Sequence, residues 1–137
     1  MGTVYTEITL KNAGDTEEVE RGLRAETAVR SVTVTAMVDT GCGTLLIGEK
    51  LREKLGLAVR GLRGGTLADG TRRICQVTGP VEIHWKDRSM TCQPLVVPGS
   101  EEVLLGSIPL EDMDLLVDPV RKELTGAHGD EVLCLLK

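Results

Sequence analysis

The sequence predicts an all-β domain, a closed barrel of short strands with only one or two short helices. Three observations lead to this fold class. Short runs of Val, Ile, Leu and Thr recur along the chain, and turn-forming Gly, Asp and Asn separate them. Aromatic residues make up 1% of the chain, so aliphatic side chains, which suit pleated strands, must form the core. Segments with helical periodicity are brief, and a length of 137 residues suits a single domain over residues 1–137.

The clearest strands are expected in the N-terminal third of the chain. Residues 4–10 alternate polar and apolar side chains and predict a first strand. Residues 12–15 have the composition of a turn, and the charged residues 17–24 predict a short, exposed helix. Residues 31–38 predict a second strand, with Val and Ala side chains on one face and Ser and Thr on the other.

The middle of the chain predicts a strand, a helix and a hairpin. Residues 45–47 are apolar and extended, and residues 48–55 predict a short helix that Gly56 ends. The Gly- and Arg-rich residues 61–65 predict a turn. Residues 66–77 then predict a hairpin around an Asp-Gly dipeptide, which is a strong turn signal.

Shorter elements are expected towards the C-terminus. Residues 81–85 and 90–97 predict two strands that pair across residues 86–89. A buried strand, a short helix and two apolar strands complete the expected fold, at residues 103–105, 109–115, 115–117 and 132–136.

Composition and charge exclude several classes of function. The net charge is −5 and no basic patch with interleaved aromatics is present in the sequence, so we expect no nucleic-acid partner. No apolar run approaches the ~20 residues that cross a bilayer, so we expect no membrane partner. Residues 1–11 lack the apolar core of a signal peptide, and we therefore expect a cytoplasmic protein.

The four cysteines predict neither a metal site nor another cofactor. They stand far apart, at Cys42, Cys75, Cys92 and Cys134, without the paired spacing of zinc ligands. In a reducing cytosol they are expected to remain free thiols. Both histidines are isolated in the sequence, which favours structural or exposed roles for them.

The candidate catalytic residues are Asp39, Thr40 and Gly41, which follow directly after the strand predicted over residues 31–38. A carboxylate at the end of a buried strand is costly unless it is hydrogen-bonded or used in a reaction. The glycine allows a sharp turn that brings backbone amides close to this carboxylate. The threonine hydroxyl can bond across an interface. The tripeptide is by itself a weak signal, because strand-ending turns of this composition also arise by chance.

The surroundings of this tripeptide resemble the retropepsin-like aspartic proteases over residues 31–117, as a bacterial-type member with a single domain. Members of that family carry an apolar strand, then Asp-Thr-Gly, a small residue and a second apolar strand, as residues 34–47 do here. In the family a hairpin flap that closes over the substrate follows. The resemblance places Ala68, Asp69 and Gly70 at the tip of this flap and implies a substrate-binding role for them.

A second family signature follows the flap: two apolar residues and a glycine that lead into a short helix. Leu104, Leu105 and Gly106 match it in order and spacing. The resemblance implies that these three residues pack under the catalytic loop and support it. Two ordered signatures with a hairpin between them make the match more specific than the tripeptide alone.

Several positions depart from the retroviral members of the family. Those proteins commonly have an Asp two residues after the motif glycine and an Arg just after the second-signature glycine, where this chain has Gly43 and Ser107. In the retroviral proteins this Asp and this Arg are expected to form an ion pair, and both of its members are replaced in this chain. Cys42 stands where most members have Ala or Ser, and it either makes activity sensitive to oxidation or is an inert thiol. Residues 12–30 form an insertion without a retroviral counterpart.

The resemblance implies an aspartic endopeptidase that acts as a homodimer on an extended peptide or protein. The chemistry needs two carboxylates that share a proton, and this chain has one Asp-Thr-Gly. Each subunit is therefore expected to contribute Asp39 across a twofold axis, with strands 4–10 and 132–136 as candidate interface elements. Two alternatives stay open: a catalytically silent dimeric peptide-binding module of the same fold, and an unrelated β-rich structural domain with a chance motif.

Overall fold

The protein is described by a computed structural model that covers residues 3–134 and 136. The strands are β1 (Val4–Asn12), β2 (Ser31–Val38), β3 (Leu45–Ile47), β4 (Val59–Thr66), β5 (Arg72–Thr78), β6 (Val81–Trp85), β7 (Arg88–Cys92), β8 (Leu95–Val96), β9 (Leu104–Leu105), β10 (Leu115–Asp118) and β11 (Glu123–Gly126). The helices are α1 (Ala13–Glu20), the short 3-10 helix η1 (Glu26–Ala28), α2 (Glu49–Leu55) and α3 (Ser107–Asp112). Within the described ranges, none of these helices has the length and apolar content needed to cross a bilayer.

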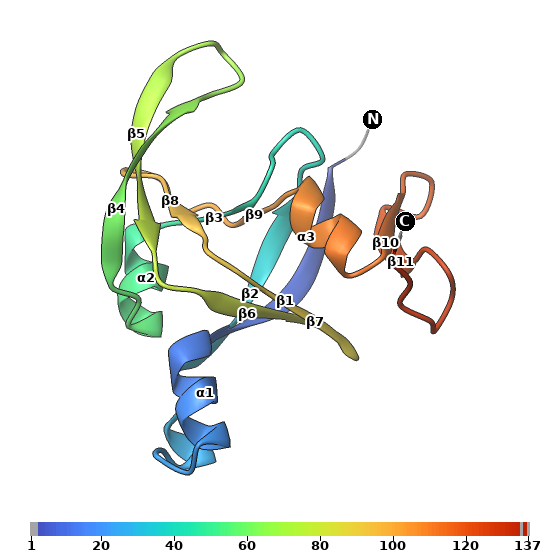
Figure 1. Cartoon of the computed structure of the whole chain (residues 1–137). Coiled ribbons are helices and arrows are strands. Elements are labelled where there is room, and N and C mark those ends of the chain that lie inside the picture. Colours follow the sequence, from blue (N-terminus) through green and yellow to red (C-terminus); the bar gives the residue numbers. More distant parts are fainter. Residues whose placement is uncertain (1–2, 135, 137) are drawn as a thin grey trace.

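The main feature is a nine-stranded sheet in the order β4-β5-β8-β3-β9-β2-β1-β6-β7. This sheet curls like the wall of a barrel, and the β4–β5 hairpin projects beyond it at the upper left of Figure 1. A second sheet pairs β10 with β11 beside α3. The β-rich fold with short helices that the sequence predicts is confirmed.

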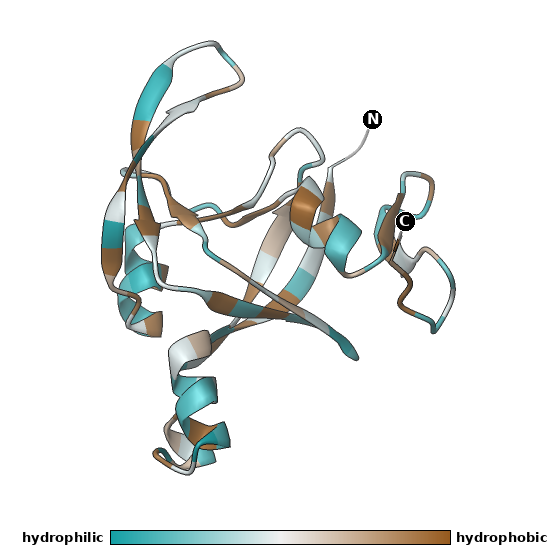
Figure 2. Ribbon diagram, viewed as in Figure 1, coloured by the Kyte–Doolittle hydropathy of each residue, from teal (hydrophilic) through white to brown (hydrophobic). Residues whose placement is uncertain are grey.

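Aliphatic side chains from the inner faces of the strands form the core. Figure 2 shows hydrophobic segments on the central strands, whereas α1 is largely hydrophilic. Removal of apolar surface from water stabilises the fold by about 25 cal/mol per Å². Members of this core with almost no exposed surface include Ile8, Leu10, Leu45, Ile47, Ile83, Leu105 and Met113.

Two predicted strands and one helix agree closely with the structure. β2 and β3 have the predicted bounds, and α2 begins one residue after the predicted start. Gly56 ends α2 with a φ of 65°, a left-handed conformation that glycine adopts without a Cβ penalty. A local signal, either strict alternation or a helix-ending glycine, was therefore sufficient at these positions.

The β4–β5 hairpin differs from its prediction in the first strand. Residues 67–71 form the turn as expected, but residues 61–65 belong to β4 and are not a turn. Gly64 pairs with Ile74 and Gly65 pairs with Arg73 of β5. Glycine is unfavourable in strands because it has no side chain to pack, and the ladder with β5 overrides that preference.

Residues 12–15 lead from strand to helix without the predicted turn. Asn12 is the last residue of β1 and the N-cap of α1, because its side chain accepts a hydrogen bond from the Asp15 N–H at 3.0 Å. The same side chain donates to the Leu55 carbonyl at 2.8 Å. The helix therefore begins at residue 13, before the charged segment 17–24 in which it was expected. Asn is common both in turns and at helix N-caps, so its presence at position 12 does not distinguish a turn from the start of a helix.

The C-terminal region is also organised differently from its prediction. β10 forms as predicted, but its partner is β11 at residues 123–126, which the sequence analysis did not identify. Residues 132–134 form no strand and Leu135 lies outside the described residues, so the strand expected over 132–136 is wrong for the described part. The buried Arg88 holds this region by donating to the two carbonyl groups that precede β10, at 2.9 and 2.8 Å.

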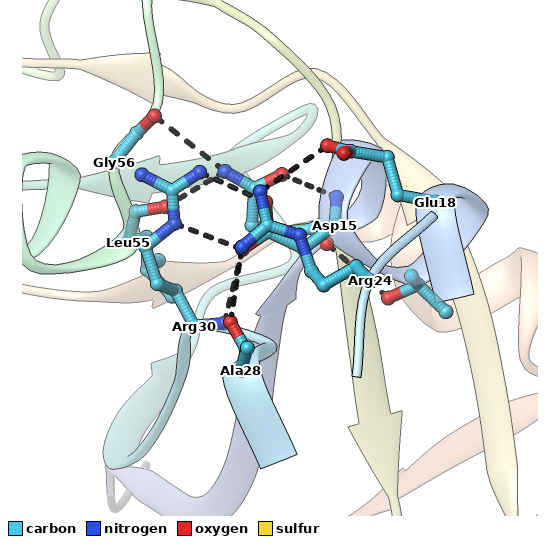
Figure 3. A network of polar contacts seen from close by, with 9 residues as sticks. Asp15, Glu18, Arg24, Ala28, Arg30, Leu55 and Gly56 are labelled. Carbon is cyan, nitrogen blue, oxygen red and sulfur yellow. Dashed lines mark hydrogen bonds and ion pairs between the residues drawn. The ribbon is translucent and has the colours of Figure 1, made fainter. Parts of the chain in front are cut away.

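Asp15 anchors the segment that connects β1 with β2 (Figure 3). Its side chain is 2% exposed and accepts hydrogen bonds from the Arg30 backbone N–H at 3.0 Å and from Nε and Nη2 of Arg30 at 2.8 Å each. Arg24 adds an ion pair at 3.3 Å. The side-chain hydrogen bonds from Arg30 lower the pKa of the Asp15 carboxyl to about 2, against the opposing effect of burial. These contacts therefore join the start of the insertion over residues 12–30 to its last residue, Arg30, directly before β2.

We expect Asp15→Asn to lower the free energy of unfolding by about 2 kcal/mol at neutral pH. The carboxyl has a lower pKa in the folded state, about 2, than its usual 3.8. It therefore stabilises the fold above pH 3.8, and this contribution is lost as the pH falls through about 2. Denaturant titrations of both proteins from neutral pH down to about pH 3 would show the difference between them shrinking.

Glu17→Gln is the matched control for this measurement. Glu17 lies on the same helix and pairs with Arg21 at 3.5 Å, but both side chains are more than 60% exposed. Exposed ion pairs of this kind contribute about 0–1 kcal/mol. Equal destabilisation by the two substitutions, or a loss in Asp15→Asn that does not change with pH, would contradict the assigned role of Asp15.

Candidate active site

The Asp39 loop follows β2 directly and is fixed by backbone hydrogen bonds. The Asp39 N–H donates to the Leu105 carbonyl at 3.0 Å, and the Cys42 N–H donates to the Asp39 carbonyl at 3.1 Å. The Gly41 N–H donates to Oδ1 of Asp39 at 2.9 Å. The carboxylate is half-buried, while Thr40 and Gly41 are exposed. The loop thus presents one oriented carboxylate at the surface of the subunit.

The second signature lies beneath this loop. Leu104 and Leu105 form β9, which runs parallel to β2 on one side and antiparallel to β3 on the other. A Cβ atom on Gly106 would lie 2.4 Å from the Thr44 carbonyl oxygen and 2.5 Å from the Cys42 carbonyl oxygen. Only glycine allows the backbone to pass this close to the loop. The structure therefore brings together the two signatures that the sequence analysis selected.

Backbone contacts join the two signatures at the positions where the retroviral ion pair is missing. The Ser107 N–H donates to the Cys42 carbonyl at 2.8 Å, and the Ile108 N–H donates to the Gly43 carbonyl at 3.1 Å. These two backbone hydrogen bonds attach the start of α3 to the Asp39 loop, and no charged side chain takes part in them. The replacement of Asp and Arg by Gly43 and Ser107 therefore leaves the loop held from below.

The predicted flap tip is exposed and has its own turn structure. Gly70 has a φ of 86°, and its N–H donates to the Leu67 carbonyl at 2.9 Å. Oδ1 of Asp69 accepts from the Thr71 hydroxyl at 2.6 Å and from the Thr71 N–H at 2.9 Å. These bonds, the hydroxyl first, lower the pKa of the Asp69 carboxyl. Ala68 is likewise exposed, so in this subunit the three tip residues point to solvent.

A cavity of about 370 Å³ separates the Asp39 loop from the arms of the hairpin. Its lining does not include the tip residues Ala68, Asp69 and Gly70. Both the loop and the hairpin lie on the upper side of the sheet in Figure 1. The lining residues are Gly41, Cys42, Gly43 and Thr44 from the loop, Leu46, Leu95, Val97 and Ile108 from the sheet and α3, and Arg63, Gly65, Thr66, Leu67, Arg73 and Cys75 from the hairpin.

The lining residues from the hairpin arms were not expected from the sequence. Arg63 and Gly65 fall in the segment that was assigned to a turn, and a turn has no alternating faces. Side chains in a strand alternate between its two faces. A strand predicted over residues 59–66, paired with β5, would therefore have placed Arg63 and Gly65 on one face.

Cys42 lies in the cavity wall, and its Sγ donates to the Thr44 carbonyl at 3.3 Å. Burial, and to a smaller extent the negative charge of Asp39, raises the pKa of the Cys42 thiol above its usual value. The thiolate is the form that reacts with oxidants. A raised pKa lowers the fraction of thiolate, and both roles of Cys42 stay predictions.

The described residues contain no cluster of three His, Cys, Asp or Glu side chains arranged to hold a metal ion. The reactive group of the site is the Asp39 carboxylate, in the loop whose residues 41–44 line the cavity; Asp39 itself is not part of that lining. A carboxylate in this position can act as a general base toward a water molecule when a second, protonated carboxyl group stands beside it.

Comparisons with known proteins identify the family and the fold. The family described as aspartyl protease matches residues 25–108, which is more than half of the chain. No curated protein matches the sequence. Among solved structures, the retroviral protease-like domain of Ddi1 from Leishmania major is similar, with a TM-score of 0.56 and 17% identity, over 91% of this chain and 88% of that chain.

A second similar structure is a retropepsin-like aspartic protease from Rickettsia conorii, with a TM-score of 0.47 and 17% identity, over 86% of this chain and 89% of that chain. At such identities, the likeness to the Leishmania major domain concerns the fold. Taken with the family match over residues 25–108, it leads to one conclusion: this chain belongs to the aspartyl protease family and has a retropepsin-like fold.

Proposed function

We propose that this protein is an aspartic endopeptidase that acts as a homodimer, in which each subunit contributes Asp39. The observation that carries the proposal is the position of the Asp39 loop. The loop is held from below by β9, its carboxylate accepts the Gly41 N–H at 2.9 Å, and it borders the cavity under the β4–β5 hairpin. Asp39 is half-buried two residues before the first loop residue of the cavity lining, Gly41, and no ion pair occupies its carboxylate among the described residues.

The mechanism follows from two carboxylates that lie close together. Like charges at short separation cannot both ionise easily, so one Asp39 stays anionic and the other is protonated. The anionic carboxylate removes a proton from a water molecule, which attacks the carbonyl carbon of the peptide bond. The neutral carboxyl group donates a hydrogen bond to the carbonyl oxygen. The two groups titrate as one coupled pair, and neither has a pKa of its own.

The dimer follows from the count of carboxylates, because one chain supplies one Asp-Thr-Gly. The exposed Thr40 side chain lies beside Asp39, where a twofold axis between the two loops would bring the threonines together. The terminal strands are weaker interface candidates than the sequence suggested. β1 lies inside the sheet between β2 and β6, and residues 132–134 form no strand.

The substrate class is an extended peptide or protein segment. Clefts beside a β-hairpin bind such segments by adding a strand, and pockets for alternate side chains provide specificity. Leu46, Leu95, Val97 and Ile108 give the cavity an aliphatic wall. A hydrophobic side chain next to the cleaved bond fits this wall.

We expect Asp39→Asn to abolish peptide hydrolysis while the fold is retained. Asn keeps the hydrogen bond from the Gly41 N–H but cannot act as a general base. The measurement is turnover of a peptide library by the purified variant, with circular dichroism as a check on the fold. Asp130→Asn changes an exposed carboxylate far from the loop in sequence and serves as the matched control.

Activity of Asp39→Asn near that of the wild type would sink the assignment. A wild-type protein that binds a statine peptide, which mimics the transition state, but hydrolyses no peptide would point to the catalytically silent peptide-binding module. Neither binding nor hydrolysis would favour a structural domain.

The shared site predicts a specific result when subunits are mixed. If wild-type and Asp39→Asn chains exchange at random in equal amounts, a mixed dimer holds one functional carboxylate and is inactive. The activity per wild-type chain should then fall to about half of its value without the variant. In a second experiment the wild-type protein is diluted. The activity per chain should fall together with the fraction of dimer, which analytical ultracentrifugation measures. Activity unchanged by both mixing and dilution would exclude the shared carboxylate pair.

A further inference from the structure

The β4–β5 hairpin has a charge opposite to that of the protein as a whole. Its strands and turn, residues 59–78, contain four arginines and one aspartate, which gives 4 − 1 = +3. The complete chain has a net charge of −5. A basic hairpin over a cleft attracts negatively charged ligands, because low-dielectric walls concentrate the field of the nearby charges.

The pairing register decides which of these arginines face the cavity. Residues directly opposite each other in an antiparallel ladder share one face of the sheet, as do residues two apart in one strand. Arg63 pairs with Cys75, and Gly65 pairs with Arg73, so all four lie on the same face. All four also line the cavity beside the Asp39 loop. Arg72 pairs with Thr66 in the alternate register and is not part of the lining.

Arg63 is available for a ligand in this arrangement. Among the residues that the structure describes, its guanidinium has no carboxylate within ion-pair distance and no hydrogen-bond acceptor. Gly65 follows it on the same face and places no side chain between Arg63 and Arg73. A peptide backbone can therefore approach the hairpin between the two guanidinium groups.

Arg73 has a more constrained position. Its Nη1 donates to the Pro98 carbonyl at 3.0 Å, which holds the guanidinium against the loop after β8. Arg73 also lines an adjoining cavity of about 240 Å³, together with Leu46, Leu67 and Val97, which both cavities share. Glu102 lines the adjoining cavity and partly offsets the charge of Arg73 there. Arg63 should therefore contribute more than Arg73 to the recognition of an anion.

We propose that Arg63, with Arg73, selects peptide substrates that carry an acidic side chain close to the hydrophobic residue at the cleavage site. The inference rests on the proposed protease function and specifies its substrate class. The aliphatic wall accepts the hydrophobic side chain, and the guanidinium groups accept a carboxylate from a neighbouring position of the extended peptide. Arginine binds carboxylates through paired N–H donors, and such charge-assisted bonds are stronger than neutral ones.

The experiment uses statine-containing peptides, so that binding is measured without turnover. Pairs of peptides share a central Leu and differ only by Glu or Gln at one flanking position. At one or more positions we expect the wild type to bind the Glu peptide about tenfold more tightly, which corresponds to about 1.4 kcal/mol. The ratio should fall toward one in Arg63→Gln and fall only in part in Arg63→Lys, which keeps the charge but not the paired donors. It should also decrease with added salt, because the ions screen exposed charges.

Arg72→Gln is the matched control, because it removes the same charge from the same hairpin on the opposite face. It should keep the wild-type ratio of Glu to Gln binding. An equal loss in Arg72→Gln and Arg63→Gln would show that only the overall charge matters and would overturn the assignment. A wild-type ratio near one at every position would overturn it as well.

Parallel hydrolysis of the same peptides with an ordinary peptide bond separates this inference from the proposed function. Cleavage without a preference for Glu leaves the protease in place and rejects the role of Arg63. Glu-selective binding without cleavage supports the role of Arg63 and rejects turnover. Absence of binding to every peptide rejects both.

Discussion

The short strand β9 is the constraint on which the rest of the structure depends. It is the fifth of nine strands in the main sheet, and its ladders join the half that contains β2 and β1 to the half that contains β3 and the hairpin. A strand of two residues has little stability of its own. It is held because both of its edges are paired and because Leu105 is fully buried. Gly106 then lets the chain pass within contact of the Asp39 loop, so the loop and the sheet are positioned together.

The site combines parts with different physical tasks. The loop supplies an oriented carboxylate, the central strands supply an aliphatic wall, and the hairpin supplies positive charge in a protein that is otherwise acidic. The proposed chemistry needs two carboxylates, and one chain supplies one Asp-Thr-Gly. Assembly and catalysis are therefore linked in the proposed enzyme. In the same proposal, Arg63 and Arg73 on the hairpin select substrates by charge, in addition to the selection by apolar shape.

The insertion between β1 and β2 shows how a charged segment can belong to the folded domain. Its sequence predicted a turn over residues 12–15 and an exposed helix over residues 17–24, yet Asp15 is buried and held by Arg30 and Arg24. Asn12 joins the same segment to the end of α2 through the Leu55 carbonyl. Arg30 also packs against Gly56, where any Cβ atom would collide with the guanidinium. The buried carboxylate with its several donors therefore fixes the two ends of the insertion to each other, and the Asn12 contact joins them to the end of α2.

The sequence by itself determined the features that depend on neighbours along the chain. Strict alternation gave β2, a helix-ending glycine gave the end of α2, and the order of two short signatures gave the Asp39 loop and its support. Only the tertiary structure decided the features that depend on distant partners. Residues 61–65 became a strand because β5 pairs with them, β11 formed against β10, and Arg63 reached the cavity because the ladder register turned it inward. Local composition cannot specify such contacts, because a ladder hydrogen bond and a buried ion pair gain their free energy from a partner that the local sequence does not contain.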